Sequence, residues 1–221
     1  MPPKAFVSWS SGKDSAFALL EASRQGLAEI VGILTTITET YDRVAMHGVR
    51  NSLLDRQIHA LDLPCIKVPL PAACTNDVYD ARMSEAIAKI QAQGVRHMVF
   101  GDLFLEDIRA YREERLAAAG MEGIFPLWKR DTRALADAMI DSGMLAHLVC
   151  IDPKKLDATF AGRRFDRDLL AALPPSVDPC GENGEFHTVV SAGPMFRAPI
   201  PVEVGTIVER DGFVFADVTA T

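Results

Sequence analysis

Short apolar runs alternate along the chain with longer segments in which apolar residues recur at helical spacing. The apolar runs end in Gly or small polar residues, as buried strands of parallel sheets do. This pattern predicts strands at 4–9, 30–35, 65–68, 97–100 and 145–151, a short apolar piece at 124–125, and helices at 16–25, 52–60, 78–93, 106–119 and 132–142. Strands that alternate with helices predict a Rossmann-like α/β fold, in which a parallel sheet is sandwiched by helices.

The pattern changes after Asp152. A helix is predicted at 167–173, followed by two prolines and a polar, Gly-rich stretch. Strands predicted at 202–209 and 213–218 are separated by Arg210-Asp211-Gly212, which is typical of a β-hairpin with Gly in the turn. We therefore expect a sheet domain over residues 1–128 and a smaller α+β lobe over residues 129–221.

A loop of small polar residues, the 10–15 loop, joins the first predicted strand to the first helix, with the sequence Ser10-Ser11-Gly12-Lys13-Asp14-Ser15. Backbone N–H groups and the helix dipole converge at such a junction and attract phosphate. Gly12 permits close approach, the Ser hydroxyls can donate hydrogen bonds, and Lys13 adds a positive charge. Val7 and Asp14 occupy positions at which a Walker A loop needs other residues, and the single Gly excludes a dinucleotide-binding loop. A turn that only caps the helix is the alternative.

The polar stretch contains a second candidate site, the 181–188 motif, with the sequence Gly181-Glu182-Asn183-Gly184-Glu185-Phe186-His187-Thr188. Such a segment has little apolar surface to bury and suits a polar binding loop. Glu182 and Glu185 could orient an amine or act as general bases, and His187 could move a proton. Asn183 and Thr188 could fix orientation through hydrogen bonds. A surface turn explains the same residues.

Four further features have two interpretations each. Asp14 either holds Mg²⁺ beside phosphates or caps the first helix. A salt-bridged helix face is favoured over a phosphate site for three arginines at helical spacing: Arg109, Arg112 and Arg115. Segment 46–51 either closes over a ligand or only leads into a helix. Cys180 is read as a buried thiol rather than a nucleophile paired with His187, because nothing nearby marks an oxyanion site.

The two motifs carry a family resemblance. The 10–15 loop resembles the Ser-Gly-Gly-x-Asp-Ser loop of PP-loop ATP pyrophosphatases, with Ser11 in place of the first Gly. The 181–188 motif resembles the Gly-Glu-Gly-Gly-Glu-(Phe/Tyr)-x-Thr motif of the diphthine–ammonia ligase (diphthamide synthase) family. Pro126-Leu127-Trp128 and Gly101-Asp102 match the same family in the same order. The sequence departs from the pattern of the diphthine enzymes at Asn183, at His187 and over residues 105–112. In these departures it resembles a bacterial-type branch of the family, for which diphthine would be the wrong acceptor.

The resemblance implies a fold of the adenine nucleotide alpha hydrolase-like (HUP) type, with ATP and Mg²⁺ as cofactors. It makes residues 1–128 a PP-loop ATP-binding domain and residues 129–221 a substrate-binding lobe. ATP would be bound by the 10–15 loop, Thr35, Gly101 and Asp102. In that scheme the enzyme adenylates a carboxylate, releases pyrophosphate and transfers the acyl group to ammonia or an amine. The catalytic residues implied are Lys13, Asp14, Glu182, Glu185 and His187, and the acceptor would contact Gly181, Glu182, Asn183, Gly184, Glu185 and Thr188.

Composition narrows the setting. The net charge of −7 argues against a surface built for long nucleic acid, and no apolar run is long enough to span a membrane. No secretory signal is visible at the N-terminus, so a cytoplasmic location is expected. The four cysteines form no CxxC pair, which leaves no sign of a zinc or redox site. A homo-oligomer is compatible with the sequence. A PP-loop tRNA-modifying enzyme and a non-catalytic ATP or AMP sensor are the alternative functions.

Overall fold

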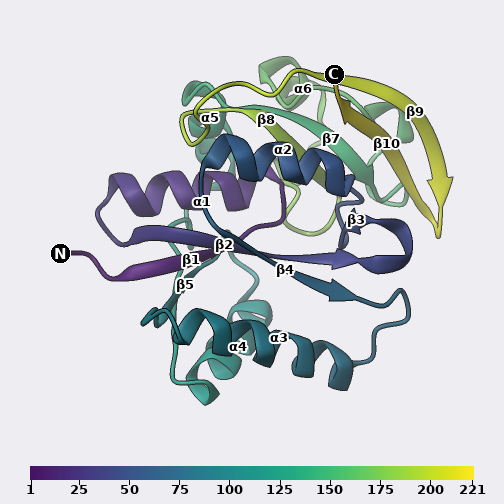
Figure 1. Cartoon of the computed structure of the whole chain (residues 1–221). Coiled ribbons are helices and arrows are strands. Elements are labelled where there is room, and N and C mark those ends of the chain that lie inside the picture. Colours follow the sequence, from purple (N-terminus) through teal and green to yellow (C-terminus); the bar gives the residue numbers. More distant parts are fainter.

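The computed structural model describes residues 1–221 and contains two β-sheets (Figure 1). The strands of the first sheet are β1 (Lys4–Ser8), β2 (Glu29–Thr38), β3 (Arg43–Val44), β4 (Cys65–Leu70), β5 (His97–Val99) and β6 (Glu122–Ile124). All pairings in this sheet are parallel except that between β2 and β3. The parallel strands follow the order β4-β2-β1-β5-β6. From β1 the chain adds β2 and β4 on one side, and it then returns to add β5 and β6 on the other side of β1, so the strand order reverses between β1 and β5. Open α/β sheets bind ligands at this reversal point, beyond the carboxyl ends of the strands.

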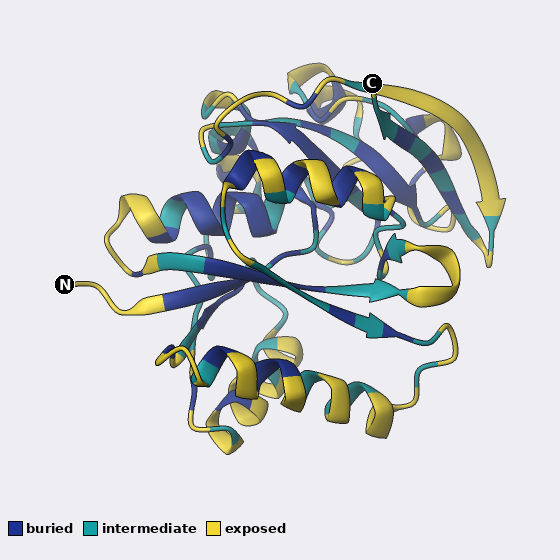
Figure 2. Cartoon of the chain, in the orientation of Figure 1, coloured by how far each residue is buried: buried dark blue, intermediate teal, exposed yellow.

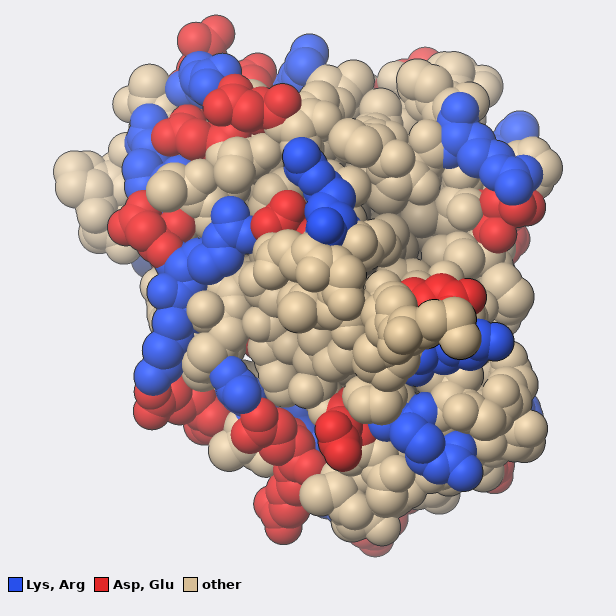
Figure 3. All heavy atoms as spheres, turned by 90° about the vertical axis from the view of Figure 1, so that its left-hand side faces the viewer, with Lys and Arg blue, Asp and Glu red and all other residues tan.

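Helices cover both faces of the first sheet, which confirms the predicted α/β fold. On one face lie α1 (Lys13–Arg24) and α2 (Asn51–Leu61), and on the other lie α3 (Asn76–Gln91) and α4 (Glu106–Ala118) (Figure 1). None of the helices is long and apolar enough to cross a membrane. Acidic and basic side chains are interspersed on the face shown in Figure 3, without a large patch of either sign.

The second sheet is antiparallel and lies on the outer side of α1 and α2 (Figure 1). Its order is β8-β7-β10-β9, and its strands are β7 (Leu145–Ile151), β8 (Phe186–Ala192), β9 (Val202–Arg210) and β10 (Phe213–Ala220). Helices α5 (Thr132–Asp141) and α6 (Arg167–Ala172) belong to the same lobe, and single turns of 3-10 helix lie at Glu39–Tyr41 and Ala158–Phe160. The first sheet, α1, α2 and the second sheet form successive layers.

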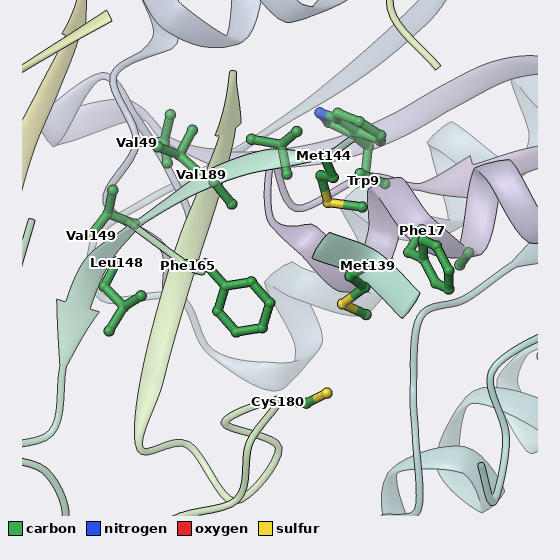
Figure 4. Close-up of a cluster of buried hydrophobic side chains, with 14 of the residues drawn as sticks. Trp9, Phe17, Val49, Met139, Met144, Leu148, Val149, Phe165, Cys180 and Val189 are labelled. Carbon is green, nitrogen blue, oxygen red and sulfur yellow. The ribbon is translucent and has the colours of Figure 1, made fainter. Parts of the chain in front are cut away.

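Two hydrophobic cores of unequal size fill these layers. A cluster of 44 buried residues is continuous from the first sheet through α1 and α2 to the second sheet, whereas only 12 buried residues lie on the side of α3 and α4. Figure 4 shows part of the larger core, where Trp9 and Phe17 approach Met139 and Met144 of the C-terminal lobe. Helix α4 buries only Leu116, and the outward faces of α3 and α4 are exposed (Figure 2). A cavity lies on this side, between the first sheet and helices α3 and α4.

The structure corrects three expectations. Residues 145–151 form a strand, but it lies in the antiparallel sheet and does not continue the parallel one. The end of the 181–188 motif is not a loop, because β8 begins at Phe186. This strand is buried along nearly its whole length, so it lacks the alternation that marks a half-exposed strand. Strand β2 runs on to Thr38 and therefore does not end at Thr35, where the sequence predicted its end.

Candidate functional site

The 10–15 loop lies at the reversal point of the first sheet, between the end of β1 and the start of α1. Gly101 directly follows the neighbouring strand β5 and packs on the first turn of α1. A Cβ atom at Gly101 would lie 2.7 Å from the backbone carbonyl carbon of Asp14, a distance that real Cβ atoms do not tolerate. Glycine at this position therefore allows the end of β5 and the start of α1 to come together.

Segments that are far apart in the sequence meet at this loop. The backbone N–H of Lys13 donates to the Thr188 hydroxyl at 3.0 Å, and the N–H of Val190 donates to the Ser11 carbonyl at 2.9 Å. The Glu182 carboxylate accepts the N–H of Leu103 at 2.8 Å, beyond the end of β5. The 181–188 motif thus touches both the 10–15 loop and the segment after Gly101-Asp102, so the structure brings the two predicted motifs together.

Gln57 of α2 holds this junction from within the core, and it was not singled out by the sequence. Its side chain is fully buried. Its Nε2 donates to the carbonyls of Ser11 at 3.1 Å and Val190 at 2.7 Å, and its Oε1 accepts the indole N–H of Trp9 at 3.1 Å. The available signal was a Gln on the apolar stripe of α2, whose other buried members are Leu53, Leu54, Ala60 and Leu61.

The side chain of Lys13 points into the protein. Its ammonium group donates to both Asp14 carboxylate oxygens, at 2.9 and 3.0 Å, and to the Cys180 carbonyl. Burial is the largest single influence and opposes the charge on Lys13, but the attraction and hydrogen bond of Asp14, together with other nearby acidic groups, raise the pKa of the amine. The predicted contact of Lys13 with phosphate remains a prediction, and it would require the ammonium group to leave these partners. Gly12, at the start of α1, has no side-chain cap, so Asp14 does not act as the helix cap.

The two glutamates of the 181–188 motif differ in environment. Burial raises the pKa of Glu182 to about 7, and the nearby carboxylates of Asp14 and Asp102 act in the same direction. Glu185 is 3% exposed and accepts hydrogen bonds from the backbone N–H of Asp178 at 3.0 Å and the side-chain amide of Asn183 at 3.2 Å. Glu182 can exchange a proton near neutral pH, whereas Glu185 shapes the loop.

Two glycines give the motif its turns. Gly181 and Gly184 have φ angles of +71° and +78°, which side chains other than Gly rarely adopt. A Cβ at Gly181 would also lie 2.9 Å from the Phe186 carbonyl oxygen. Asn183 itself is exposed, and its carbonyl accepts a hydrogen bond from Lys155 at 2.6 Å. The predicted acceptor contacts of these residues remain predictions.

Residues 43–50 form a second wall of the site. His47 contacts the 10–15 loop so closely that a Cβ at Gly12 would lie 2.7 Å from the imidazole. The segment is fastened to the second sheet by Asp217, which accepts hydrogen bonds from Arg50 at 2.5 and 2.8 Å and from Arg43 at 3.1 and 3.2 Å. The segment therefore both leads into α2 and lines the site.

A cavity of about 830 Å³ opens beside the 10–15 loop and extends between the first sheet and helices α3 and α4. Ser10, His47 and His187 line it near the loop, and Arg112 and Arg115 line it at α4. The remaining lining is mostly apolar and includes Leu34, Leu70, Met83, Ile87, Met98 and Phe100. A size of this order and a mostly apolar lining with few polar groups are typical of small-molecule sites.

The cavity fits an adenine nucleotide. The Thr35 hydroxyl lines it, is 1% exposed, and has no hydrogen-bond partner within the chain. Buried polar atoms are normally paired, so this hydroxyl is suited to a polar group of a ligand. The Ser11 hydroxyl, just before the start of α1, is also buried and has no hydrogen-bond partner within the chain. These two unpaired hydroxyls, beside a mostly apolar cavity, are compatible with a ligand that has an apolar ring and phosphates.

The predicted salt-bridged face of α4 is present in part: Arg109 pairs with a residue of the same helix, whereas Arg112 and Arg115 pair with aspartates outside α4 and line the cavity. Arg109 pairs with Glu113 at 2.8 Å, Arg112 with Asp102 at 3.0 Å, and Arg115 with Asp80 at 2.8 Å. Asp102 therefore binds an arginine in the free chain. Cys180 is buried and its thiol donates to the Thr132 carbonyl at 3.3 Å, and burial raises its pKa, so it is not a thiolate nucleophile.

No group of three or more His, Cys, Asp and Glu side chains is placed to hold a metal ion. The Asp14 carboxylate lies in the first turn of α1, and its side chain is 28% exposed. Mg²⁺ is commonly held by one or two carboxylates together with substrate phosphates, so a nucleotide would have to supply the other ligands.

Comparisons with known proteins identify the family of the chain. A model of the diphthamide synthase N-terminal domain matches residues 3–122, and a model of the diphthamide synthase C-terminal domain matches residues 131–216. The chain is similar to the diphthine–ammonia ligase of Danio rerio, with 24% identity over 95% of this chain and 90% of that protein. It is also similar to the diphthine–ammonia ligase of Schizosaccharomyces pombe, with 23% identity over 91% of this chain, but it spans only 36% of that longer protein. The chain belongs to the diphthamide synthase family.

Proposed function

We propose that the protein is an ATP-dependent, AMP-forming ligase that adenylates a carboxylate and transfers the acyl group to ammonia or an amine. The observation that carries the proposal is the junction of the 10–15 loop, the segment after β5 and the 181–188 motif, made by Thr188, Val190 and Glu182. This junction brings a phosphate-attracting helix start together with a titratable carboxylate, at the mouth of a cavity that fits a nucleoside. Adenylation followed by acyl transfer requires these parts in one place.

ATP would lie with its adenine toward Thr35 and its phosphates on Ser10, Ser11, Gly12 and Ser15. The N–H groups and hydroxyls of this loop would stabilise negative charge that accumulates on pyrophosphate as it leaves. Asp14 would hold Mg²⁺ together with the phosphates, which first requires that it release Lys13 in part. Lys13 could then turn toward the phosphates.

The acceptor would approach from the 181–188 motif. Glu182, whose pKa is raised to about 7 by burial, is suited to take a proton from ammonium or an amine as nitrogen attacks the acyl carbon. Glu185 would act indirectly, because its contacts with Asp178 and Asn183 set the shape of the loop. This division assigns proton transfer to Glu182 and loop geometry to Glu185.

The similar proteins are named diphthine–ammonia ligases, so diphthine and ammonia are the first candidate substrates for this chain. The low identity, together with Asn183 and His187 in the motif, leads us to propose a carboxylate acceptor of the same reaction class, which a substrate screen must identify. Residues 1–128 would form the ATP-binding part and residues 129–221 the acceptor-binding part, in a cytoplasmic enzyme able to form homo-oligomers.

Product analysis tests the proposal. The protein would be incubated with ATP, Mg²⁺ and ammonium, with and without a panel of carboxylic acids that includes diphthine-containing elongation factor. AMP and pyrophosphate that depend on an acceptor are expected. ADP and phosphate would contradict adenylation. Tight ATP binding without turnover would favour a sensor, and products that depend on tRNA would favour a tRNA-modifying enzyme.

A further inference from the structure

The 10–15 loop lacks an available fixed positive charge. Lys13 is 1% exposed, and its ammonium group donates to the Asp14 carboxylate and the Cys180 carbonyl. Arg112 and Arg115 line the cavity at α4, but each is already paired with an aspartate. A site for three or four phosphate charges would normally bring basic side chains to the ligand.

Two imidazoles lie where those charges are needed. His47 and His187 both line the cavity beside Ser10, and their ring centres are 4.6 Å apart. His47 comes from the segment fastened by Asp217, and His187 from β8, so the pair bridges the two lobes next to Gly12. Neither the 10–15 loop nor the 181–188 motif predicts this pairing, because His47 lies in neither.

The hydrogen bonds define the protonation of His47. Its Nδ1 is 3.0 Å from the Thr188 carbonyl oxygen, which can only accept, so Nδ1 carries the proton. In the neutral ring, Nε2 then keeps its lone pair. Burial lowers the pKa of His47 to about 4 and that of His187 to about 3, so both rings are neutral at pH 7 in the free chain.

We propose that His47 and His187 together take up one proton when a polyphosphate binds at the 10–15 loop, and that the resulting imidazolium neutralises part of the phosphate charge. The inference rests on the proposed nucleotide site and adds a residue, His47, and a proton to it. The proton comes from solvent, and no bond other than N–H forms or breaks.

The surrounding charges explain why uptake waits for the ligand. The charged groups that face the pair are Lys13, which repels a proton, and Asp14, which attracts one but is bound to Lys13, both from α1. Each imidazole also repels a proton on the other. A bound polyanion reverses this balance, and an opposite charge within about 4–6 Å typically shifts a pKa by about 1–3 units. Two charged rings only 4.6 Å apart would repel strongly, so one proton is shared.

Histidine nitrogen NMR tests the proposal directly, because the chain has only five histidines. Protein with ¹⁵N-labelled histidine would be titrated with inorganic pyrophosphate between pH 5 and 7. We expect two neutral rings in the free protein, with His47 in its Nδ1–H form. At saturation the shared apparent pKa should rise by about 1–3 units. Two rings that stay neutral at saturation, or no pyrophosphate binding at millimolar concentration, would overturn the proposal.

Matched variants assign the effect. His47→Gln and His187→Gln should each weaken pyrophosphate binding most at pH 5, by about tenfold for a rise of about 2 units, and flatten its pH dependence. His59→Gln changes an exposed histidine of α2 and should leave binding and its pH dependence unchanged. Equal loss at all pH values in the two site variants would indicate packing rather than protonation. Proton uptake without AMP formation would leave this inference standing and refute the ligase proposal.

Discussion

Replacing Gln57 by alanine is expected to lower the free energy of unfolding by about 3–4 kcal/mol and to weaken ATP binding. The side chain makes three hydrogen bonds in a fully buried position, to Trp9, Ser11 and Val190. It joins the end of β1, the 10–15 loop and β8 from one point on α2. Its loss therefore acts on the junction that the proposed reaction needs.

The magnitude follows from the partners that are left behind. The Trp9 indole N–H and the Val190 carbonyl lose the contacts that Gln57 provides, whereas the Ser11 carbonyl keeps the N–H of Val190 at 2.9 Å. An unsatisfied buried polar group costs about 1–3 kcal/mol. Two such groups at about 1.5 kcal/mol each, with some lost packing, give roughly 3–4 kcal/mol. For a chain of this size the melting temperature should fall by roughly 6–16 °C.

Urea unfolding followed by circular dichroism measures the change, and ATP titration measures the effect on the site. Gln93→Ala is the matched control, because Gln93 is exposed and its only side-chain hydrogen bond goes to the Lys89 carbonyl at the end of α3. The control should change stability by less than about 0.5 kcal/mol. A loss below about 1 kcal/mol for Gln57→Ala, or unchanged ATP affinity, would refute the positioning role.

Three other changes test the site. Glu182→Gln removes a carboxyl group whose pKa is about 7 in the folded chain and ordinary in the unfolded chain, so ionising this group destabilises the fold as pH rises from about 4.5 to 7. In urea unfolding at pH 8 the variant should therefore be about 2 kcal/mol more stable than the original protein. In product analysis it should lose acyl transfer but keep pyrophosphate release. Asp217→Asn should raise the KM for ATP several-fold, because it weakens the hydrogen bonds from Arg50 that hold the segment around His47. An unchanged KM would show that the contact between Asp217 and this segment does not support the site. Lowering the pH from 7.5 to 5 should reduce the free energy of unfolding by about 2 kcal/mol for each of His47 and His187. The reason is that these histidines take up protons below about pH 6.5 in the unfolded chain, but only near pH 4 and pH 3 in the folded chain. Equal urea midpoints at both pH values, or a loss that persists in the double Gln variant, would contradict this prediction.

The first sheet and its helices could be predicted from sequence because their signals are local. Apolar runs that end in Gly or Ser, followed by helical spacing, identify β1 and α1, and the 10–15 loop lies between them as expected. Strand β8 escaped prediction because it is buried on both faces and begins within a polar motif. The sheet to which β7 belongs depends on pairing with β8 and β10, and no local pattern encodes that pairing.

The composition of the site was predictable, but its connections were not. The resemblance brought the 10–15 loop and the 181–188 motif into one proposal, whereas the contacts that join them run through Thr188 and Gln57. The inward turn of Lys13 was also hidden, because a lysine in a phosphate loop is expected to face its ligand. It pairs instead with its neighbour Asp14, and long-range packing against Phe165 and Phe186 buries the charge.

Isotope transfer tests the central claim most directly. A carboxylate acceptor found by product analysis would be labelled with ¹⁸O in its carboxyl group and incubated with the protein, ATP, Mg²⁺ and ammonium. If the carboxylate attacks the α-phosphorus and ammonia then displaces AMP from the acyl carbon, one carboxylate oxygen remains on AMP. Mass spectrometry should then find one ¹⁸O atom in the phosphate of AMP and none in pyrophosphate. Unlabelled AMP, or label in inorganic phosphate released with ADP, would contradict adenylation of the carboxylate.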